Sequence, residues 1–279
     1  MSFFQDQTFA RRAAAMMIVV VIAGAAKMQA ASRQDIDESA IVLGRIGVAK
    51  LALVHGLKGE ARANIKSAID AAQGLRPNTP KFSMAFGLLS YKTSSGEGRS
   101  FVPLVGGAFS ARMLDEKLLK SGATKTELTD AEVTHAQVGI NGDAVKAGLQ
   151  KSEEALRRGQ GDAALAVLNG ITDAALTPSE TAQGTLQLAR DSLMLAQQLL
   201  KDRDFRAAAF AAGHAREALS AAADTDSVLK AKAADTNKAI KGLDDLGDSI
   251  RSGRTLGQKS PEAAASELAR QLEGLAPKG

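Results

Sequence analysis

The sequence contains no cysteine, no tryptophan and a single tyrosine among its 279 residues. The absence of cysteine excludes disulfide bonds and thiol nucleophiles, so the stability of the fold must come from its hydrophobic core. A chain of this length, enough for one large domain or two small ones, can bury sufficient apolar surface for that. Aromatic residues make up only 4% of the chain, and the apolar content is mostly alanine and leucine, which favour helices. The composition therefore predicts a mainly helical protein.

Strong charge of either sign is also lacking. The formal net charge is +4, with 24% charged residues, and no dense stripe of lysine and arginine interleaved with aromatic residues occurs along the chain. We therefore expect no nucleic-acid partner.

The chain has no apolar run as long as the roughly 20 residues that a membrane-spanning helix needs. Its longest run covers 14 residues, from Ala13 to Ala26, and follows two arginines. The run ends with small residues, Gly24 and Ala26, at positions −3 and −1 of a cleavage site, which is the layout of a secretory signal. We predict a cleaved signal peptide over residues 1–26, a periplasmic location and no stable membrane span after processing. An uncleaved anchor, an ordinary buried helix and the twin-arginine route remain as alternatives.

Apolar residues recur at helical spacing in several segments, and short motifs mark helix ends. Helices are expected over Ser39–His55 and Glu60–Leu75, and the longest amphipathic run lies between Leu186 and Leu200. Further helix starts are predicted from a capping box or a Ser-Pro pair at Thr129–Glu132, Thr177–Glu180 and Ser260–Glu262.

Residues 78–112 have a different pattern. Two apolar runs, Phe82–Tyr91 and Phe101–Phe109, flank the Gly- and Ser-rich stretch Thr93–Gly98. This arrangement predicts a β-hairpin or two short strands, although Pro103 weakens the second of them.

An Ala-rich segment recurs along the chain. Ala61–Ala72 aligns without gaps on Ala164–Ala175, and Ala207–Ala218 is a looser copy. Each copy follows a helix that ends in a short polar turn, so the repeated unit is helix, tight turn and Ala-rich helix. The spacing between copies is irregular, which favours hairpins packed in one domain over a regular solenoid. Chance similarity between Ala-rich helices remains the alternative.

Together these patterns predict a mainly all-α fold of packed antiparallel helical hairpins, with a small β-hairpin-like insertion around residues 82–109. The main helical domain is expected over residues 34–223, followed by a C-terminal helical extension over residues 224–279. The extension either packs on the core or contacts a partner.

The sequence shows no recognisable catalytic motif. The histidines His55, His135 and His214 are far apart, and His214 has a carboxylate, Glu217, spaced so that both would share one helical face. Serine-nucleophile motifs and phosphate-binding glycine loops are missing. We therefore predict a protein that is not an enzyme, with no catalytic, cofactor-binding or metal-binding residues, and keep metal binding through His214 as a minor alternative.

Five of the few aromatic residues lie in the predicted β insertion: Phe82, Phe86, Tyr91, Phe101 and Phe109. Aromatic side chains beside alanine-lined helices can shape an apolar pocket or groove. These five residues are therefore the predicted apolar binding surface, and packing in the core is the other interpretation.

Several segments resemble, in order, the YfdX-like proteins of bacterial envelopes, within about residues 40–221. They are Gly47–Gly56, Glu60-Ala61, Ala68–Ala72, Phe101–Leu104, Ala155–Gly159, Ala163–Leu168, Ala189–Leu200 and Asp204–Ala208. The chain departs from the family pattern after Thr177, where an apolar-Pro-apolar run is missing, and after Ala223, where the tail is an addition. It therefore resembles a distant member. The resemblance implies a mostly helical periplasmic protein linked to stress responses, with chaperone-like or small-molecule-binding activity and no established catalytic residues.

The leading expectation is a non-enzymatic periplasmic protein that captures apolar surface between its hairpins. Its partners would be unfolded or envelope protein clients, or apolar small molecules, and it would need no cofactor. Self-association into a homo-oligomer is left open. The alternative is an envelope adaptor that binds a partner through its hairpins or through the C-terminal extension.

Overall fold

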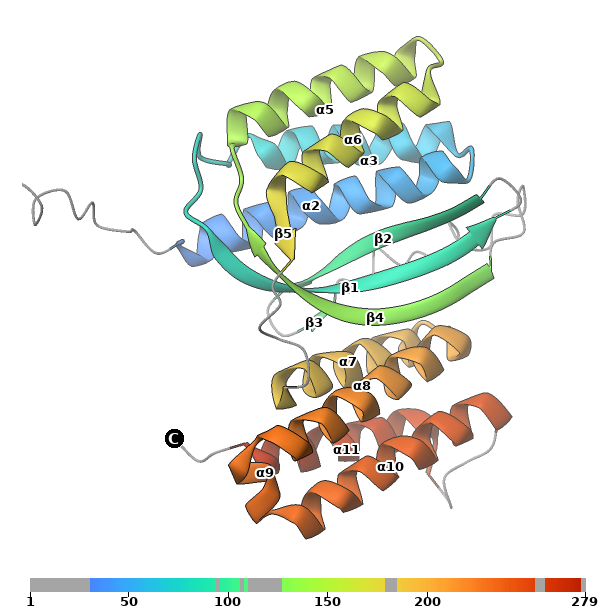
Figure 1. The fold of residues 1–279 in the computed structure, drawn as a ribbon. Coiled ribbons are helices and arrows are strands. Elements are labelled where there is room, and N and C mark those ends of the chain that lie inside the picture. The colour runs from blue at the N-terminus through green and yellow to red at the C-terminus, as the bar shows by residue number, and fades with distance from the viewer. Residues whose placement is uncertain are drawn as a thin grey trace, which may run out of the picture.

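The structure is a computed structural model that describes residues 31–93, 96–105, 108–109, 127–178, 185–253 and 259–276. The predicted signal peptide, residues 1–26, lies outside this part of the chain. The described elements form three layers, with a sheet between two sets of helices (Figure 1). No helix within the described ranges has both the length and the apolar character needed to cross a membrane.

Two antiparallel helical hairpins cover one side of the sheet, at the top of Figure 1. They are α2 (Arg33–Val54) with α3 (Lys58–Ala72), and α5 (Gly142–Arg157) with α6 (Gly161–Ala175). The first two helices confirm the prediction for residues 39–75. Ser32 caps α2, where its hydroxyl and the carboxylate of Asp35 form a capping box. The hydrogen bond from Ser32 and the charge of Arg76 hold the pKa of Asp35 below its usual value.

The middle layer is an antiparallel sheet with the strand order β3-β2-β1-β4-β5. Its strands are β1 (Phe82–Thr93), β2 (Gly96–Val105), β3 (Ala108–Phe109), β4 (Glu127–Val138) and β5 (Leu176–Pro178). The hairpin of β1 and β2 confirms the predicted insertion. The sheet is larger than expected, because β4 pairs with β1 along most of its length.

The helix start predicted at Thr129–Glu132 is wrong, because all four residues lie in β4. A capping box is a local signal, and pairing with β1 together with burial of Ala131 and Val133 outweighs it. Thr177 and Pro178, predicted to open a helix, lie in β5. Residues 179 and 180 of that motif lie outside the described residues.

The helices after β5 form the layer on the other side of the sheet. They are α7 (Leu186–Lys201), α8 (Phe205–Thr225), α9 (Ser227–Ala231), α10 (Ala233–Ser252) and α11 (Pro261–Leu275). Helix α7 confirms the predicted amphipathic run, and Ser260 caps α11 as predicted, accepting a hydrogen bond from the Ala263 amide at 3.3 Å.

The predicted domain boundary at residue 223 falls inside α8. Helix α10 packs on α8 and α11 packs on α7, so that Leu243, Leu246 and Leu272 are buried in the same core as the α7–α8 hairpin. The described residues after 223 therefore complete this helical layer.

The three predicted hairpin repeats share one turn geometry. In each turn one residue adopts the left-handed conformation: Gly56, Gly159 and Arg203, with φ of 71°, 80° and 60°. The same two backbone hydrogen bonds close each turn, as in Gly56 N to Leu53 O and Leu57 N to Ala52 O. The positions 5, 9, 12 and 16 residues after each left-handed residue are buried. This register starts the third copy at Ala208, one residue later than the sequence alignment placed it.

We expect Arg203→Gly to raise the free energy of unfolding by about 1 kcal/mol. A non-glycine residue in the left-handed region is strained by roughly that amount, and the exposed Arg203 occupies the position that glycine holds in the other two turns. Urea unfolding followed by circular dichroism measures the change. Gly159→Arg is the reciprocal control, and its free energy of unfolding should fall by a similar amount. Equal stabilities for the original chain and both variants would contradict the strain that we assign to Arg203.

Helix α2 approaches β2 more closely than a side chain at the contact would allow. A Cβ atom added to Gly47 would lie 2.6 Å from the backbone oxygen of Phe101. The Ser100 hydroxyl donates a hydrogen bond to the Gly47 carbonyl oxygen at 3.4 Å. Gly47 therefore sets the spacing between the first helical layer and the sheet.

Candidate functional site

The structure places the described members of the predicted aromatic surface in the interior. Phe86 is fully buried, Phe82 is 9% exposed, and Phe101 is partly buried. The rings of Phe86 and Phe101 contact each other edge to face, with their centroids 6.3 Å apart. The side chains of Tyr91 and Phe109 lie outside the described residues. Phe82 and Phe86 thus belong to the core and not to an accessible apolar surface, because the sheet is covered by helices on both sides.

A hollow of about 370 Å³ opens between α10 and α11. Its walls carry charged and amide side chains, and its floor is apolar. The residues that line it are Lys238, Lys241, Gly242, Asp245, Lys259, Ala264, Glu267, Leu268 and Gln271.

Helix geometry explains why these residues meet. Lys238, Lys241 and Asp245 are three and four residues apart on α10, so their side chains share one face of that helix. Gly242 lies between them, and a Cβ added there would meet Leu268 of α11 at 2.5 Å. The two helices therefore come close at Gly242, and the long side chains on either side of this contact form the walls.

The hollow combines positive charge with an apolar floor. Three lysines line it against two carboxylates. Lys259 forms an ion pair with Glu267, and this hydrogen bond and charge hold the pKa of Glu267 below its usual value. Ala264 and Leu268 on the floor are 8% and 5% exposed. Such a surface suits a small ligand that has both an anionic group and an apolar part.

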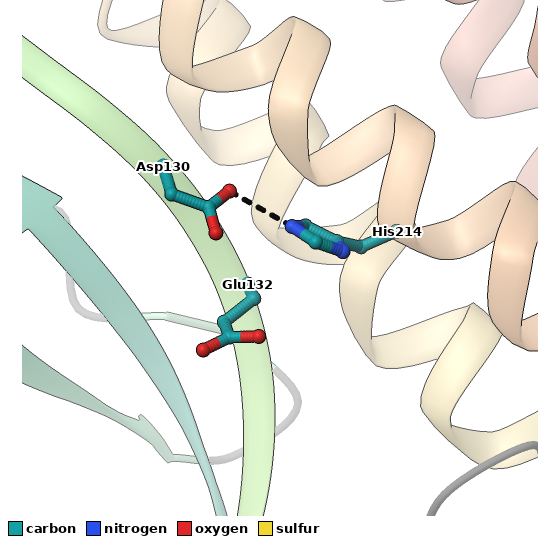
Figure 2. Close-up of side chains that lie close together, drawn as sticks. All are labelled: Asp130, Glu132 and His214. Carbon is teal, nitrogen blue, oxygen red and sulfur yellow. Dashed lines mark hydrogen bonds and ion pairs between the residues drawn. The ribbon is translucent and has the colours of Figure 1, made fainter.

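A second polar cluster joins β4 to α8. His214 Nε2 lies 2.8 Å from Asp130 Oδ1, and one carboxylate oxygen of Glu132, two residues along the strand, lies within 4.8 Å of the ligand atoms of both (Figure 2). On the other side of the ring, His214 Nδ1 lies 3.6 Å from Glu217 Oε2. The predicted pairing of His214 and Glu217 is therefore confirmed. Asp130 and Glu132 were missed, since their segment was predicted to be helical.

A third polar contact joins β4 to α7. The Asp191 carboxylate, in a residue only 2% exposed, accepts hydrogen bonds from His135 Nε2 at 2.9 Å and from Gln187 Nε2 at 2.8 Å. Each of the two Asp191 carboxylate oxygens accepts one of the hydrogen bonds in this contact. We assign it a structural role in holding the helical layer on the sheet.

Two further titratable groups are buried on α2. Lys50, 8% exposed, donates a hydrogen bond from Nζ to Thr172 Oγ1 of α6 at 3.1 Å. Burial lowers the pKa of Lys50, partly offset by the charge of Asp173. Burial also lowers the pKa of His55, at the end of α2. Lys50 joins two helices of the same layer, which indicates a role in packing.

Comparison with protein-family models, with curated proteins and with solved structures finds no match for this chain.

Proposed function

We propose that this chain is a non-catalytic binding protein that holds a small amphipathic anion in the hollow between α10 and α11. The observation that carries the proposal is the coincidence of a hollow of about 370 Å³, three lysines and an apolar floor. A carboxylate, sulfonate or phosphate group would be bound by the amines, and the apolar part of the ligand would cover Ala264 and Leu268.

The chemistry of the walls supports binding rather than catalysis. The nine lining residues supply amines, two carboxylates and one amide, and none of them is a serine, threonine or histidine. They therefore offer no hydroxyl nucleophile paired with an imidazole base. The resemblance to YfdX-like envelope proteins supports a small-molecule-binding role as well. The N-terminal pattern of residues 1–26 supports a periplasmic location.

The proposal is tested with 1-anilinonaphthalene-8-sulfonate, a fluorescent anion with an apolar body. We expect the full chain to bind it and decanoate to displace it. The double variant Lys238→Glu/Lys241→Glu should bind the dye about tenfold more weakly, a change of about 1.4 kcal/mol in binding free energy, since both charge reversals face the ligand.

The matched control is Arg62→Glu/Lys66→Glu on α3, which makes the same change of net charge at two exposed residues. It should bind the dye as the original chain does. Circular dichroism and thermal unfolding check that both variants are folded, because partly unfolded proteins also bind this dye. Equal loss of affinity in the two double variants, or failure of decanoate to displace the dye, would contradict the proposal.

A further inference from the structure

The cluster at β4 and α8 has the geometry of a metal site. One ligand atom from each of Asp130, Glu132 and His214 lies within 4.8 Å of the other two. The two carboxylates project from the same face of β4 because they are two residues apart on a strand. His214 reaches them from α8, which packs along β4 (Figure 2). Two rigid elements thus bring three metal-binding side chains to one point.

The cluster is accessible and oriented. The side chains of Asp130 and His214 are 36% and 31% exposed, so an ion can enter from solvent. Asp130 Oδ1 also accepts a hydrogen bond from the Ala131 amide at 2.8 Å, which orients the carboxylate. Glu217 lies at Nδ1 of the same imidazole that presents Nε2 to the carboxylates. The distance of 3.6 Å between Nδ1 and Glu217 Oε2 is that of an ion pair, and a small side-chain rotation would let Nδ1 donate a hydrogen bond to this carboxylate, the contact that commonly orients metal-binding histidines.

We infer that Asp130, Glu132 and His214 bind a divalent transition-metal ion of the Zn²⁺ class, with Glu217 positioning the histidine. One imidazole and two carboxylates form a mixed nitrogen and oxygen donor set, which suits Zn²⁺ and its neighbours in the first transition row, whereas Mg²⁺ and Ca²⁺ prefer oxygen ligands alone. Bonds of about 2.0–2.2 Å bring ligand atoms to roughly 3–3.5 Å from one another, so small side-chain rotations close the site. Three protein ligands leave a position for water or for an exogenous ligand.

The inference does not depend on the proposed function. The residues that line the hollow all belong to α10, to α11 or to Lys259 before α11, whereas the metal ligands belong to β4 and α8. Removal of metal is therefore expected to leave dye binding in the hollow unchanged.

The test is a titration of the full, untagged and metal-free chain with ZnCl₂ by calorimetry, repeated with Co²⁺ by visible absorption. We expect one site per chain, with micromolar or tighter affinity for Zn²⁺ and a Co²⁺ spectrum of low coordination number. His214→Ala and Glu132→Gln should each weaken Zn²⁺ binding at least tenfold, and Glu217→Gln should weaken it by about tenfold.

Glu132→Gln is the decisive variant, because it removes one ligand while the hydrogen bond between His214 and Asp130 stays in place. Circular dichroism checks that the variant is folded, so that a weaker Zn²⁺ affinity reports the lost ligand. The control is Asp70→Asn, an exposed carboxylate on α3, which should bind Zn²⁺ as the original chain does. Absence of binding in the original chain, or equal affinity in Glu132→Gln and Asp70→Asn, would overturn the inference.

Discussion

Asp191→Ala is expected to lower the free energy of unfolding by about 3 kcal/mol. The substitution removes a buried carboxylate that accepts hydrogen bonds from His135 on β4 and from Gln187 on α7. Breaking a buried pair by removing one partner leaves the other desolvated and unpaired, which costs about 3–5 kcal/mol. The loss should fall at the low end of this range, because the His135 side chain is 13% exposed and can still reach water.

Urea unfolding followed by circular dichroism measures the loss. Asp191→Asn keeps the shape and the acceptor oxygen but removes the charge, so it should lose about half as much. Glu154→Ala is the control: it breaks ion pairs with Arg157 and Arg158 on the surface of α5, and exposed pairs contribute about 0–1 kcal/mol. A loss below 1 kcal/mol for Asp191→Ala would show that this contact does not hold the helical layer on the sheet.

Gly47→Ala is expected to lower the free energy of unfolding by about 2–3 kcal/mol. The added methyl group would lie 2.6 Å from the Phe101 backbone oxygen, and backbone cannot rotate away as the end of a side chain can. The helix must therefore move off β2, and overpacking of this kind costs about 1–3 kcal/mol. The higher helix propensity of alanine recovers less than 1 kcal/mol of this.

Gly170→Ala is the matched control for this experiment. Gly170 lies in the exposed part of α6, and a Cβ added there would have no neighbour within 4 Å. The substitution should therefore raise the free energy of unfolding by about 0.5–1 kcal/mol. Thermal and urea unfolding of both variants give the comparison. Stabilisation by both substitutions would contradict a close contact between α2 and β2.

Little of the candidate site could be predicted from the sequence. Lys238 and Lys241 are spaced to share a helical face, but the hollow exists only because α11 folds back along α10 at Gly242. His214 and Glu217 could be paired because they lie on one helix. Asp130 and Glu132 could not be added to this pair, because their segment carries a helix-start motif. Asp130 also lies 84 residues before His214 in the chain.

The aromatic residues illustrate the same limit. Phe82 and Phe86 alternate with smaller residues as a half-exposed strand would, which is compatible with either a core or a binding surface. Phe82 and Phe86 lie in the core because helical layers cover both sides of the sheet. Only the complete set of layers shows which strand faces are covered.

The sequence by itself determined the paired helices and the turns that join them into hairpins. Alanine-rich segments, apolar spacing and short polar turns act within about 20 residues, so the pairs α2–α3, α5–α6 and α7–α8 could be predicted from local patterns. The tertiary structure alone decided the strand state of residues 127–138, the burial of Phe82 and Phe86 and both candidate sites. Each of these depends on contacts between segments far apart in the chain, and pairing with β1 supplies a row of hydrogen bonds that a local capping motif at Thr129 cannot match.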